Sequence, residues 1–280
     1  MKAKHSNRFR VRSFETDPLG RLQVPILCKL LQEAATAHAA ILGVAVETLI
    51  ESGVAWVLSR LHLDMQRWPT SDEEIIIETW PEAANRLFTE RRFEVFDASN
   101  RRIGAASTLW LILDLERRRP VRLPADVVER LGELGLGSEP RRFGDLVTPD
   151  PVDRELDFTV RRSDLDSAEH VNNTSYVEWA IEAVPDEVWS TAELAELEIQ
   201  FVAECHQGQT VLSRSQLVER GDDIEVRHQL MRHEDGAEVA RSRTVWQGGK
   251  EAHDKERFSP APLLPCPTPL SSDCGPHRPE

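Results

Sequence analysis

Two side chains suited to acid–base chemistry, Asp166 and His170, stand four positions apart in a polar stretch of the sequence. The stretch covers residues 162–179 and passes from a loop into an amphipathic segment. A carboxylate beside an imidazole can activate a nucleophile or transfer a proton. A helix N-terminus also offers unpaired N–H donors to developing negative charge. The spacing therefore predicts a catalytic site at a loop-to-helix junction.

The same residues also have structural interpretations. Asp166 can cap the following helix or close a turn, because aspartate is common at both positions. A single histidine such as His170 is more often a surface or capping residue than a base. Asn172 and Asn173 are expected to cap or brace the start of the helix. The combination of Asp166 with His170 just before a helix favours the catalytic interpretation.

The sequence contains an internal repeat. The motif Phe-x-Val-Arg, followed by an aspartate, occurs at residues 9–17 and again at residues 158–166, an offset of 149 (158 − 9). Such an offset without gaps indicates a duplicated structural unit. In the first copy the aspartate, Asp17, is followed four positions later by Arg21, whereas the second copy has His170. Only the second copy is therefore expected to carry the chemistry.

Each copy is predicted to contain a short strand, a loop, one long amphipathic helix and about four antiparallel strands. The helices are expected at Pro25–Leu42 and Asn172–Val184, and His38 lies on the apolar stripe of the first as a core histidine. This α+β pattern is typical of a sheet that wraps a central helix. The strands are expected at Ala55–Met65, Glu74–Trp80, Arg86–Phe96, Ile103–Leu115, Glu193–Glu204, Thr210–Val218, Asp223–His233 and Ala237–Gln247.

The repeat also predicts the organisation of the chain. We expect an N-terminal unit at residues 1–135, a linker at 136–155 and a C-terminal unit at 156–248. Residues 249–280 are rich in proline and show no apolar period. They are therefore predicted to form a disordered tail.

Composition limits the classes of function. The chain has 40% hydrophobic and 29% charged residues, which is typical of a soluble globular protein, and its formal net charge is −14. Such a charge argues against nucleic acid as the main partner. The sequence shows no apolar run of membrane-spanning length and no apolar N-terminal signal. We therefore expect a cytoplasmic protein without a membrane span.

The four cysteines do not form a metal-binding or disulfide pattern. Cys28 and Cys205 lie in the predicted core, and Cys266 and Cys274 lie in the predicted tail. No CxxC motif and no Cys/His spacing typical of zinc sites is present. The sequence therefore predicts neither a disulfide framework nor a metal or organic cofactor.

Seven arginines form a candidate basic patch in the first copy. An acidic macromolecular substrate would need such a patch to approach a chain of net charge −14. The alternative is a solvated strand face of no special function. The seven are Arg86, Arg91, Arg92, Arg117, Arg118, Arg119 and Arg122.

Both copies, in this order, resemble the acyl-acyl-carrier-protein thioesterases, which are double hotdog proteins of plants and bacteria. The resemblance covers roughly residues 6–247. In the first copy it is carried by Leu31-Gln32-Glu33-Ala34-Ala35, Trp56-Val57-Leu58-Ser59-Arg60-Leu61 and Arg118-Arg119-Pro120-Val121-Arg122-Leu123-Pro124. In the second copy it is carried by Asp164-Leu165-Asp166, His170-Val171-Asn172-Asn173, Tyr176, Trp179 and Glu204-Cys205.

The resemblance implies a tandem hotdog fold and hydrolysis of fatty acyl thioesters on acyl carrier protein. It implies that the N-terminal unit binds the acyl chain and that Asp166, His170 and Glu204 are catalytic. In this scheme Asp166 is the nucleophile or activates water, His170 orients or protonates the leaving group, and Glu204 holds the hydrolytic water. Without the resemblance, Glu204 reads as an exposed carboxylate at a strand end. Cys205 matches a family cysteine that is disfavoured as a nucleophile.

One position departs from the family pattern. The family's asparagine falls on Ala168, whose methyl group cannot make the hydrogen bonds of an amide. Either the catalytic set works without that amide or this member is impaired; Glu169 is a candidate substitute. Two alternatives therefore stay open, an acyl-CoA thioesterase of the same fold and a non-catalytic acyl-binding protein. Because two fused units complete the architecture in one chain, monomer and homodimer both fit.

Overall fold

The computed structural model describes residues 4–133, 139–141, 143–221 and 223–248. These residues belong to one compact unit, Met1–Gly248. The predicted tail at 249–280 lies outside the described residues. No helix in the described part of the chain is long and apolar enough to span a bilayer.

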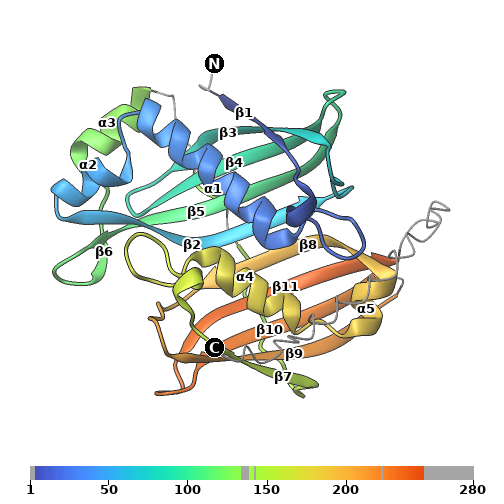
Figure 1. The fold of residues 1–280 in the computed structure, drawn as a ribbon. Helices are drawn as coiled ribbons and strands as arrows, with labels where there is room; N and C mark the ends of the chain where they lie inside the picture. Colours follow the sequence, from blue (N-terminus) through green and yellow to red (C-terminus); the bar gives the residue numbers. More distant parts are fainter. Residues whose placement is uncertain (1–3, 134–138, 142, 222, 249–280) are drawn as a thin grey trace, which may run out of the picture. The chain divides into compact units, whose positions relative to one another are not determined.

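The two copies contain the same principal elements in the same order (Figure 1). The first copy consists of β1 (His5–Arg10), η1 (Ser13–Glu15), α1 (Val24–Ile41), α2 (Val46–Glu51), β2 (Val54–Met65), β3 (Glu74–Ala84), β4 (Phe88–Asp97), β5 (Arg102–Asp114), β6 (Arg119–Val121) and α3 (Ala125–Glu133). The second consists of β7 (Arg154–Thr159), η2 (Arg162–Asp164), α4 (Asn173–Glu182), α5 (Asp186–Thr191), β8 (Ala192–Phe201), β9 (Thr210–Arg220), β10 (Asp223–Arg232) and β11 (Glu238–Gly248).

All the predicted helices and strands are present, with ends that differ by a few residues. The elements that were not predicted are the short helices α2, α3 and α5, the short strand β6 and the single 3₁₀ turns η1 and η2. Helices of six residues, such as α2 and α5, span less than two turns. They therefore carry too little of the 3.6-residue period to be recognised from sequence.

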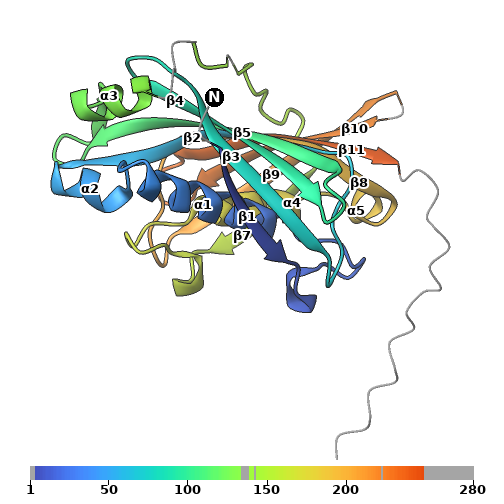
Figure 2. The same cartoon turned by 90° about the horizontal axis from the view of Figure 1, so that it is seen from above.

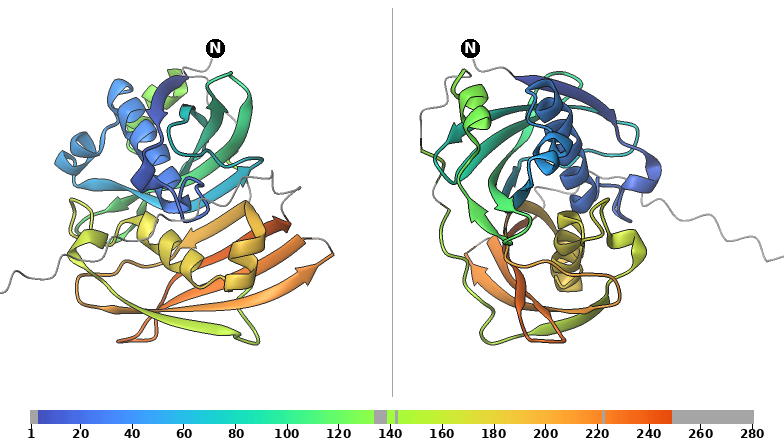
Figure 3. Two further views of the ribbon diagram at one scale, coloured as in Figure 1. Left: turned by 45° about the vertical axis from the view of Figure 1, so that its right-hand side comes forward. Right: turned by 90° about the vertical axis from the view of Figure 1, so that its left-hand side faces the viewer.

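The strands form one antiparallel sheet in the order β1-β3-β4-β5-β2-β8-β11-β10-β9-β7, and β6 pairs with β5. The two copies join where β2 pairs with β8, from Arg60 opposite Gln200 to Asp64 opposite Glu196. The long helices α1 and α4 lie on the same side of the sheet (Figure 2), and the sheet curves around them (Figure 3). The architecture is α+β, with each long helix wrapped by its own half of the sheet.

Helix α1 is buried along most of its length, as its apolar stripe predicted. Leu27 and Ala34 are fully buried, and the helix packs against β1, β3 and α4. His38 is also buried, and its Nδ1 lies 3.1 Å from Nη1 of Arg91. Burial, with the Arg91 charge second, lowers the pKa of His38 to about 4. The prediction of a core histidine is confirmed.

The buried position of Arg91 corrects one part of the predicted basic patch. Its side chain points into the core, where Nη1 also donates a hydrogen bond to Oγ1 of Thr79 at 3.2 Å. Arg92 is partly exposed and pairs with Glu90 at 3.0 Å. Inward and outward positions alternate along β4, so neighbouring arginines on one strand face opposite sides of the sheet. Arg91 therefore cannot take part in a surface patch.

Helix α4 begins at a side-chain cap. Oδ1 of Asn172 accepts hydrogen bonds from N of Thr174 at 2.9 Å and from its Oγ1 at 2.7 Å. This confirms the expected capping role of Asn172, and Asn173 is the first helical residue. Farther along, Trp179 is buried, and its carbonyl oxygen accepts a hydrogen bond from Oγ of Ser213 at 2.9 Å. The Asn172 cap fixes the start of the helix, which follows shortly after the Asp166–His170 loop.

Candidate active site

The loop that carries Asp166 and His170 is closed by backbone hydrogen bonds. Oδ1 of Asp166 accepts from N of Ala168 at 2.8 Å and from N of His170 at 3.2 Å. The backbone N of Asp166 donates to the carbonyl of His170 at 2.8 Å. Glu169 has a positive φ of 61°, which lets the chain reverse between them. Asp166 therefore closes a turn, which is one of the two structural interpretations predicted for it.

The first copy contains the same turn. Oδ1 of Asp17 accepts from N of Leu19 and from N of Arg21, both at 2.9 Å, and N of Asp17 donates to the carbonyl of Arg21 at 2.8 Å. Gly20, with φ of 78°, takes the left-handed position. The turn is thus a property of the repeat. It does not by itself indicate catalysis.

The two copies differ in the side chain at the end of the turn. In the first copy Nε of Arg21 donates to Oδ2 of Asp17 at 2.9 Å, and Nη1 donates to the carbonyl of Ala192 at 3.1 Å. The side chains of Arg21 and Asp17 are only 13% and 6% exposed. This buried ion pair neutralises the aspartate. In the second copy Asp166 is exposed, and no hydrogen bond joins its carboxylate to the His170 ring within the described ranges.

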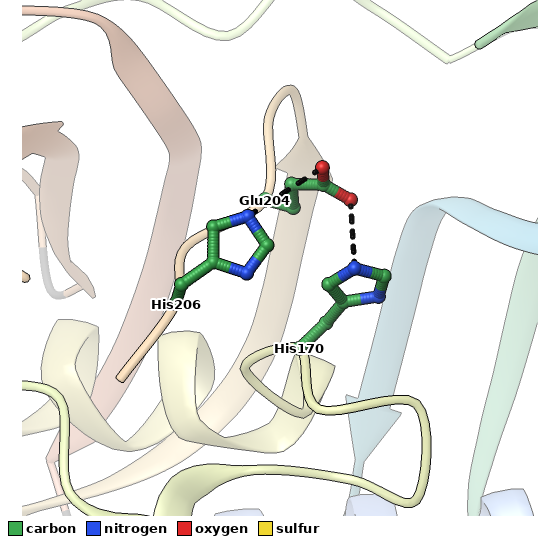
Figure 4. Close-up of side chains that lie close together, drawn as sticks. All are labelled: His170, Glu204 and His206. Atoms are coloured by element: carbon green, nitrogen blue, oxygen red, sulfur yellow. Dashed lines mark ion pairs between the residues drawn. The ribbon is translucent and has the colours of Figure 1, made fainter. Parts of the chain in front are cut away.

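The imidazole of His170 faces Glu204 instead (Figure 4). Its Nε2 lies 3.5 Å from Oε2 of Glu204, and both side chains are 36% exposed. Two of the three predicted catalytic residues therefore form a pair. The third, Asp166, lies in the same loop as His170 and is held by the backbone. The arrangement can position a water molecule and transfer a proton.

Glu204 lies beyond the end of β8, and the prediction that this strand extends to residue 204 was wrong. The strand ends at Phe201 because the N–H groups of Val202 and Ala203 both donate to one carbonyl, that of Val239, at 2.9 and 3.2 Å. Two residues opposite one is the geometry of a β-bulge, which turns the chain out of the ladder. The irregularity places Glu204 in a loop next to His170.

A backbone hydrogen bond joins the loop of Glu204 to the segment that follows the Asp166–His170 turn. N of Val171 donates to the carbonyl of Cys205 at 3.0 Å, and the matching bond in the first copy runs from N of Leu22 to the carbonyl of Pro69 at 2.7 Å. Cys205 therefore corresponds to Pro69, and Glu204 corresponds to the preceding residue, Trp68.

In the described part of the first copy, the positions equivalent to His170 and Glu204 hold a different pair of side chains. Trp68 is 5% exposed and donates from Nε1 to the carbonyl of Leu194 at 2.7 Å. The first copy thus has an arginine and a buried tryptophan where the second has His170 and Glu204. Comparison of equivalent positions in the two copies therefore identifies both His170 and Glu204 as residues in which the second copy differs from the first.

The bond from Val171 also corrects an expectation about the oxyanion donor. The sequence predicts that the start of the second helix offers an N–H group to developing negative charge, and Val171 precedes that start. The N–H of Val171 is bonded to Cys205, and the helix begins at Asn173. The first N–H groups of an α-helix have no acceptor within the helix. The backbone N–H of Asn173 is therefore the better candidate donor.

His206 is a neighbour of the pair that the sequence did not reveal. Its Nε2 lies 3.8 Å from Oε1 of Glu204, and its ring centroid lies 5.2 Å from that of His170 (Figure 4). Its side chain is 51% exposed. Its position two residues after Glu204 was the sequence signal. That position became informative once the structure showed that the strand ends before Glu204 and His206.

Arg118 links the first copy to this site. It lies in the turn between β5 and β6, has a positive φ of 52°, and its Nη2 contacts Oε1 of Glu204. Of the other predicted basic residues, those exposed around the same β5–β6 hairpin are Arg86, Arg117, Arg119 and Arg122. Among these arginines, Arg118 is the one whose charge lies against Glu204 in the described part of the chain.

A small, mainly apolar pocket adjoins the site. It lies between α1, the start of α4 and strands of the sheet. Asn173 lines it near the Asp166–His170 turn, and Phe201 lines it near the loop of Glu204. Its other lining residues are Cys28, Leu31, Gln32, Ala35, Leu58, Leu61, Phe93, Thr108, Trp110, Thr174 and Val177. Such a lining suits a hydrocarbon chain.

Cys205 is not placed to act as a nucleophile. Its side chain is fully buried, and burial raises the pKa of the thiol above its usual value. A thiol is reactive only as its thiolate, which burial disfavours. Cys28 is buried as well, so both expectations of core cysteines are confirmed. Cys266 and Cys274 lie outside the described residues.

Known proteins are similar to this chain in sequence and in fold. The chain matches the acyl-ACP thioesterase N-terminal domain over residues 2–131 and the acyl-ACP thioesterase C-terminal domain over residues 148–248. It is 26% identical to oleoyl-acyl carrier protein thioesterase 1 of Arabidopsis thaliana over 279 residues, which covers 87% of this chain and 76% of the relative.

Solved structures agree. An acyl-ACP thioesterase of Bacteroides thetaiotaomicron is 28% identical with a TM-score of 0.75, covering 87% of this chain and 98% of that one. The 12:0-ACP thioesterase from Umbellularia californica, 23% identical, shares the fold with a TM-score of 0.78 over 88% of this chain and 94% of that one. The predicted α+β double hotdog fold is confirmed. The chain belongs to the acyl-ACP thioesterase family.

Proposed function

We propose that this protein hydrolyses fatty acyl thioesters on acyl carrier protein and releases the free fatty acid. The observation that carries the proposal is the His170–Glu204 pair, 3.5 Å apart, which only the second copy contains and which lies beside an apolar pocket. Curated relatives named as acyl carrier protein thioesterases support the substrate class.

The residues divide the chemistry among them. Oδ1 of Asp166 is held by two N–H groups, so Oδ2 is the oxygen that attacks the thioester carbonyl or takes a proton from water. The N–H of Asn173 stabilises the oxyanion. As the C–S bond breaks, Nε2 of His170 gives a proton to the thiolate of the carrier arm. Where Asp166 has attacked, a water molecule held by Glu204 then cleaves the acyl–Asp166 anhydride, returns a proton to His170 and releases the fatty acid. Where Asp166 has instead taken a proton from water, that water forms the fatty acid directly and Asp166 passes its proton to His170.

The substrate's two other parts meet different surfaces. The acyl chain enters the pocket between α1 and the sheet, where burial of each methylene contributes about 0.8 kcal/mol. Acyl carrier protein approaches the exposed arginines of the β5–β6 hairpin, which offer local positive charge on a chain of net charge −14. The division into an acyl-binding N-terminal unit and a catalytic C-terminal unit is part of this proposal.

Hydrolysis assays on the full chain test the proposal. Acyl carrier protein thioesters and CoA thioesters of several chain lengths are compared for the wild type, His170→Ala and the exposed-histidine control His233→Ala. We expect hydrolysis of the carrier protein thioesters, a loss of about 10²–10⁴-fold in kcat for His170→Ala, and no loss for the control. A preference for CoA thioesters supports the acyl-CoA alternative, and no hydrolysis of either refutes the enzyme.

Ala168 is the observation that favours a second candidate, an acyl-binding protein without catalysis. Its side chain is exposed, so Ala168→Asn introduces the family amide without disturbing the core. One added hydrogen bond of about 1 kcal/mol in the transition state raises kcat about fivefold. Unchanged turnover in an active enzyme would show that the catalytic set works without this amide. Activity that appears only in Ala168→Asn would establish the impaired state of the natural chain.

A further inference from the structure

We infer that His170, Glu204 and His206 form a binding site for a zinc-class divalent cation, and that the bound cation inhibits the enzyme. The metal-binding part stands on geometry alone. The inhibitory part rests on the proposed function, because it assigns His170 and Glu204 to catalysis.

The three side chains already converge. One ring nitrogen of His170, one ring nitrogen of His206 and a carboxylate oxygen of Glu204 lie within 4.8 Å of one another (Figure 4). The two oxygens of Glu204 face one imidazole each, at 3.5 and 3.8 Å. Ligand atoms of a tetrahedral zinc ion lie roughly 3.3–3.5 Å apart, given metal–ligand bonds of about 2.0–2.2 Å. Only small side-chain movements are therefore needed.

The exposure of the site suits a reversible ligand. The side chains of His170, Glu204 and His206 are 36%, 36% and 51% exposed, so they can adjust without repacking the core. Three protein ligands leave the fourth tetrahedral position to water. Two imidazoles and one carboxylate favour Zn²⁺, Co²⁺, Ni²⁺ or Cu²⁺ over Mg²⁺ and Ca²⁺, which prefer oxygen ligands.

Arg118 sets how strongly the site binds. Its guanidinium group contacts Oε1 of Glu204, the oxygen that faces His206. A cation in the site must displace this positive charge, which opposes binding. Removal of Arg118 is therefore expected to tighten metal binding, whereas removal of His206 weakens it. These opposite effects are specific to this site.

The bound cation would block hydrolysis because it occupies the working atoms. It takes Nε2 of His170, the nitrogen that supplies the proton, and it draws Glu204 away from the imidazole. A cation held here also replaces a mobile proton by a fixed charge.

The binding test uses the full-length protein without an affinity tag. Co²⁺ is titrated by visible absorbance and displaced with Zn²⁺, in the wild type, His206→Ala, Arg118→Gln and the control His233→Ala. We expect at least tenfold weaker Zn²⁺ binding in His206→Ala, severalfold tighter binding in Arg118→Gln, and wild-type binding in the control. Mg²⁺ should not displace Co²⁺. Equal affinity of wild type and His206→Ala, or weaker binding in Arg118→Gln, overturns the site.

A separate assay tests inhibition. Zn²⁺ should slow hydrolysis by the wild type, and the concentration for half-inhibition should rise in His206→Ala by the same factor as the dissociation constant. Identical sensitivity of both proteins, or activation by Zn²⁺, overturns the inhibitory role. A protein that binds Zn²⁺ as expected but hydrolyses no thioester refutes the proposed function and leaves the metal site standing.

Discussion

Replacing Asp17 or Asp166 by asparagine should separate stability from catalysis in two equivalent turns. In each turn Oδ1 accepts two backbone N–H bonds, and an asparagine amide oxygen can accept both. What each variant loses is charge. Hydrogen bonds to a charged acceptor contribute about 1 kcal/mol more than neutral ones, and solvent screening reduces this for the exposed Asp166. Asp166→Asn should therefore lower the free energy of unfolding by only about 1 kcal/mol.

Asp17→Asn should cost considerably more. Its carboxylate also pairs with Arg21, and the two side chains are 6% and 13% exposed. Removing one partner of a buried ion pair costs about 3–5 kcal/mol because the other charge stays buried. Activity should show the reverse order. Asp166→Asn should reduce kcat by about 10²–10⁴-fold, whereas Asp17→Asn should leave it unchanged below its unfolding transition.

Two measurements check this pair of variants. Urea unfolding followed by tryptophan fluorescence gives the free energy of unfolding, and initial rates on an acyl carrier protein thioester give kcat under conditions where both variants are folded. The reasoning would be refuted by a larger stability loss in Asp166→Asn than in Asp17→Asn. A folded Asp17→Asn with a hundredfold lower kcat would refute it equally.

Three further outcomes are expected. Arg118→Gln should lower kcat/KM by up to about fivefold, because its ion pair with Glu204 is 58% and 36% exposed and contributes at most about 1 kcal/mol; a drop of a hundredfold would contradict this. Ala35→Leu should shift the preferred substrate to shorter acyl chains in a chain-length series, because Ala35 lines the pocket; an unchanged profile would count against that pocket. Burial lowers the pKa of His228 to about 3 from 6.5, so between these pH values the unfolded state binds a proton that the folded state does not. The free energy of unfolding therefore falls as the pH drops from about 6.5 towards 3, by up to about 1.4 kcal/mol per pH unit. Urea midpoints from pH 7 to 5 should therefore depend less on pH in His228→Gln, and equal slopes would rule out His228 as a source.

The repeated elements were predictable because they follow local periods. The apolar stripe of α1 and the constant offset of the Phe-x-Val-Arg motif both come from residues close in sequence. The turn at Asp166 was also within reach, since aspartate accepts hydrogen bonds from N–H groups two and four residues later. Local chemistry therefore predicted the helix–strand order and one side of the site.

The other side of the site depends on tertiary contacts that leave no local pattern. The strand before Glu204 ends early because Val202 and Ala203 share one carbonyl of a neighbouring strand, Val239. Arg118 reaches Glu204 only because β2 and β8 join the two copies, and Arg91 differs from its neighbour only in the face it occupies. Periodicity says which residues share a face but not which distant segments meet.

The turn with the buried Asp17–Arg21 pair is an internal reference for the stability of the turn that holds Asp166. Active-site residues often lower the stability of an enzyme. That cost is usually measured by comparison with an inactive relative. Here one chain holds two turns with the same backbone hydrogen bonds, one with the exposed Asp166 and one with the buried Asp17–Arg21 pair. Exchanging side chains between the two turns would measure, within a single fold, how the free energy of unfolding and kcat change together.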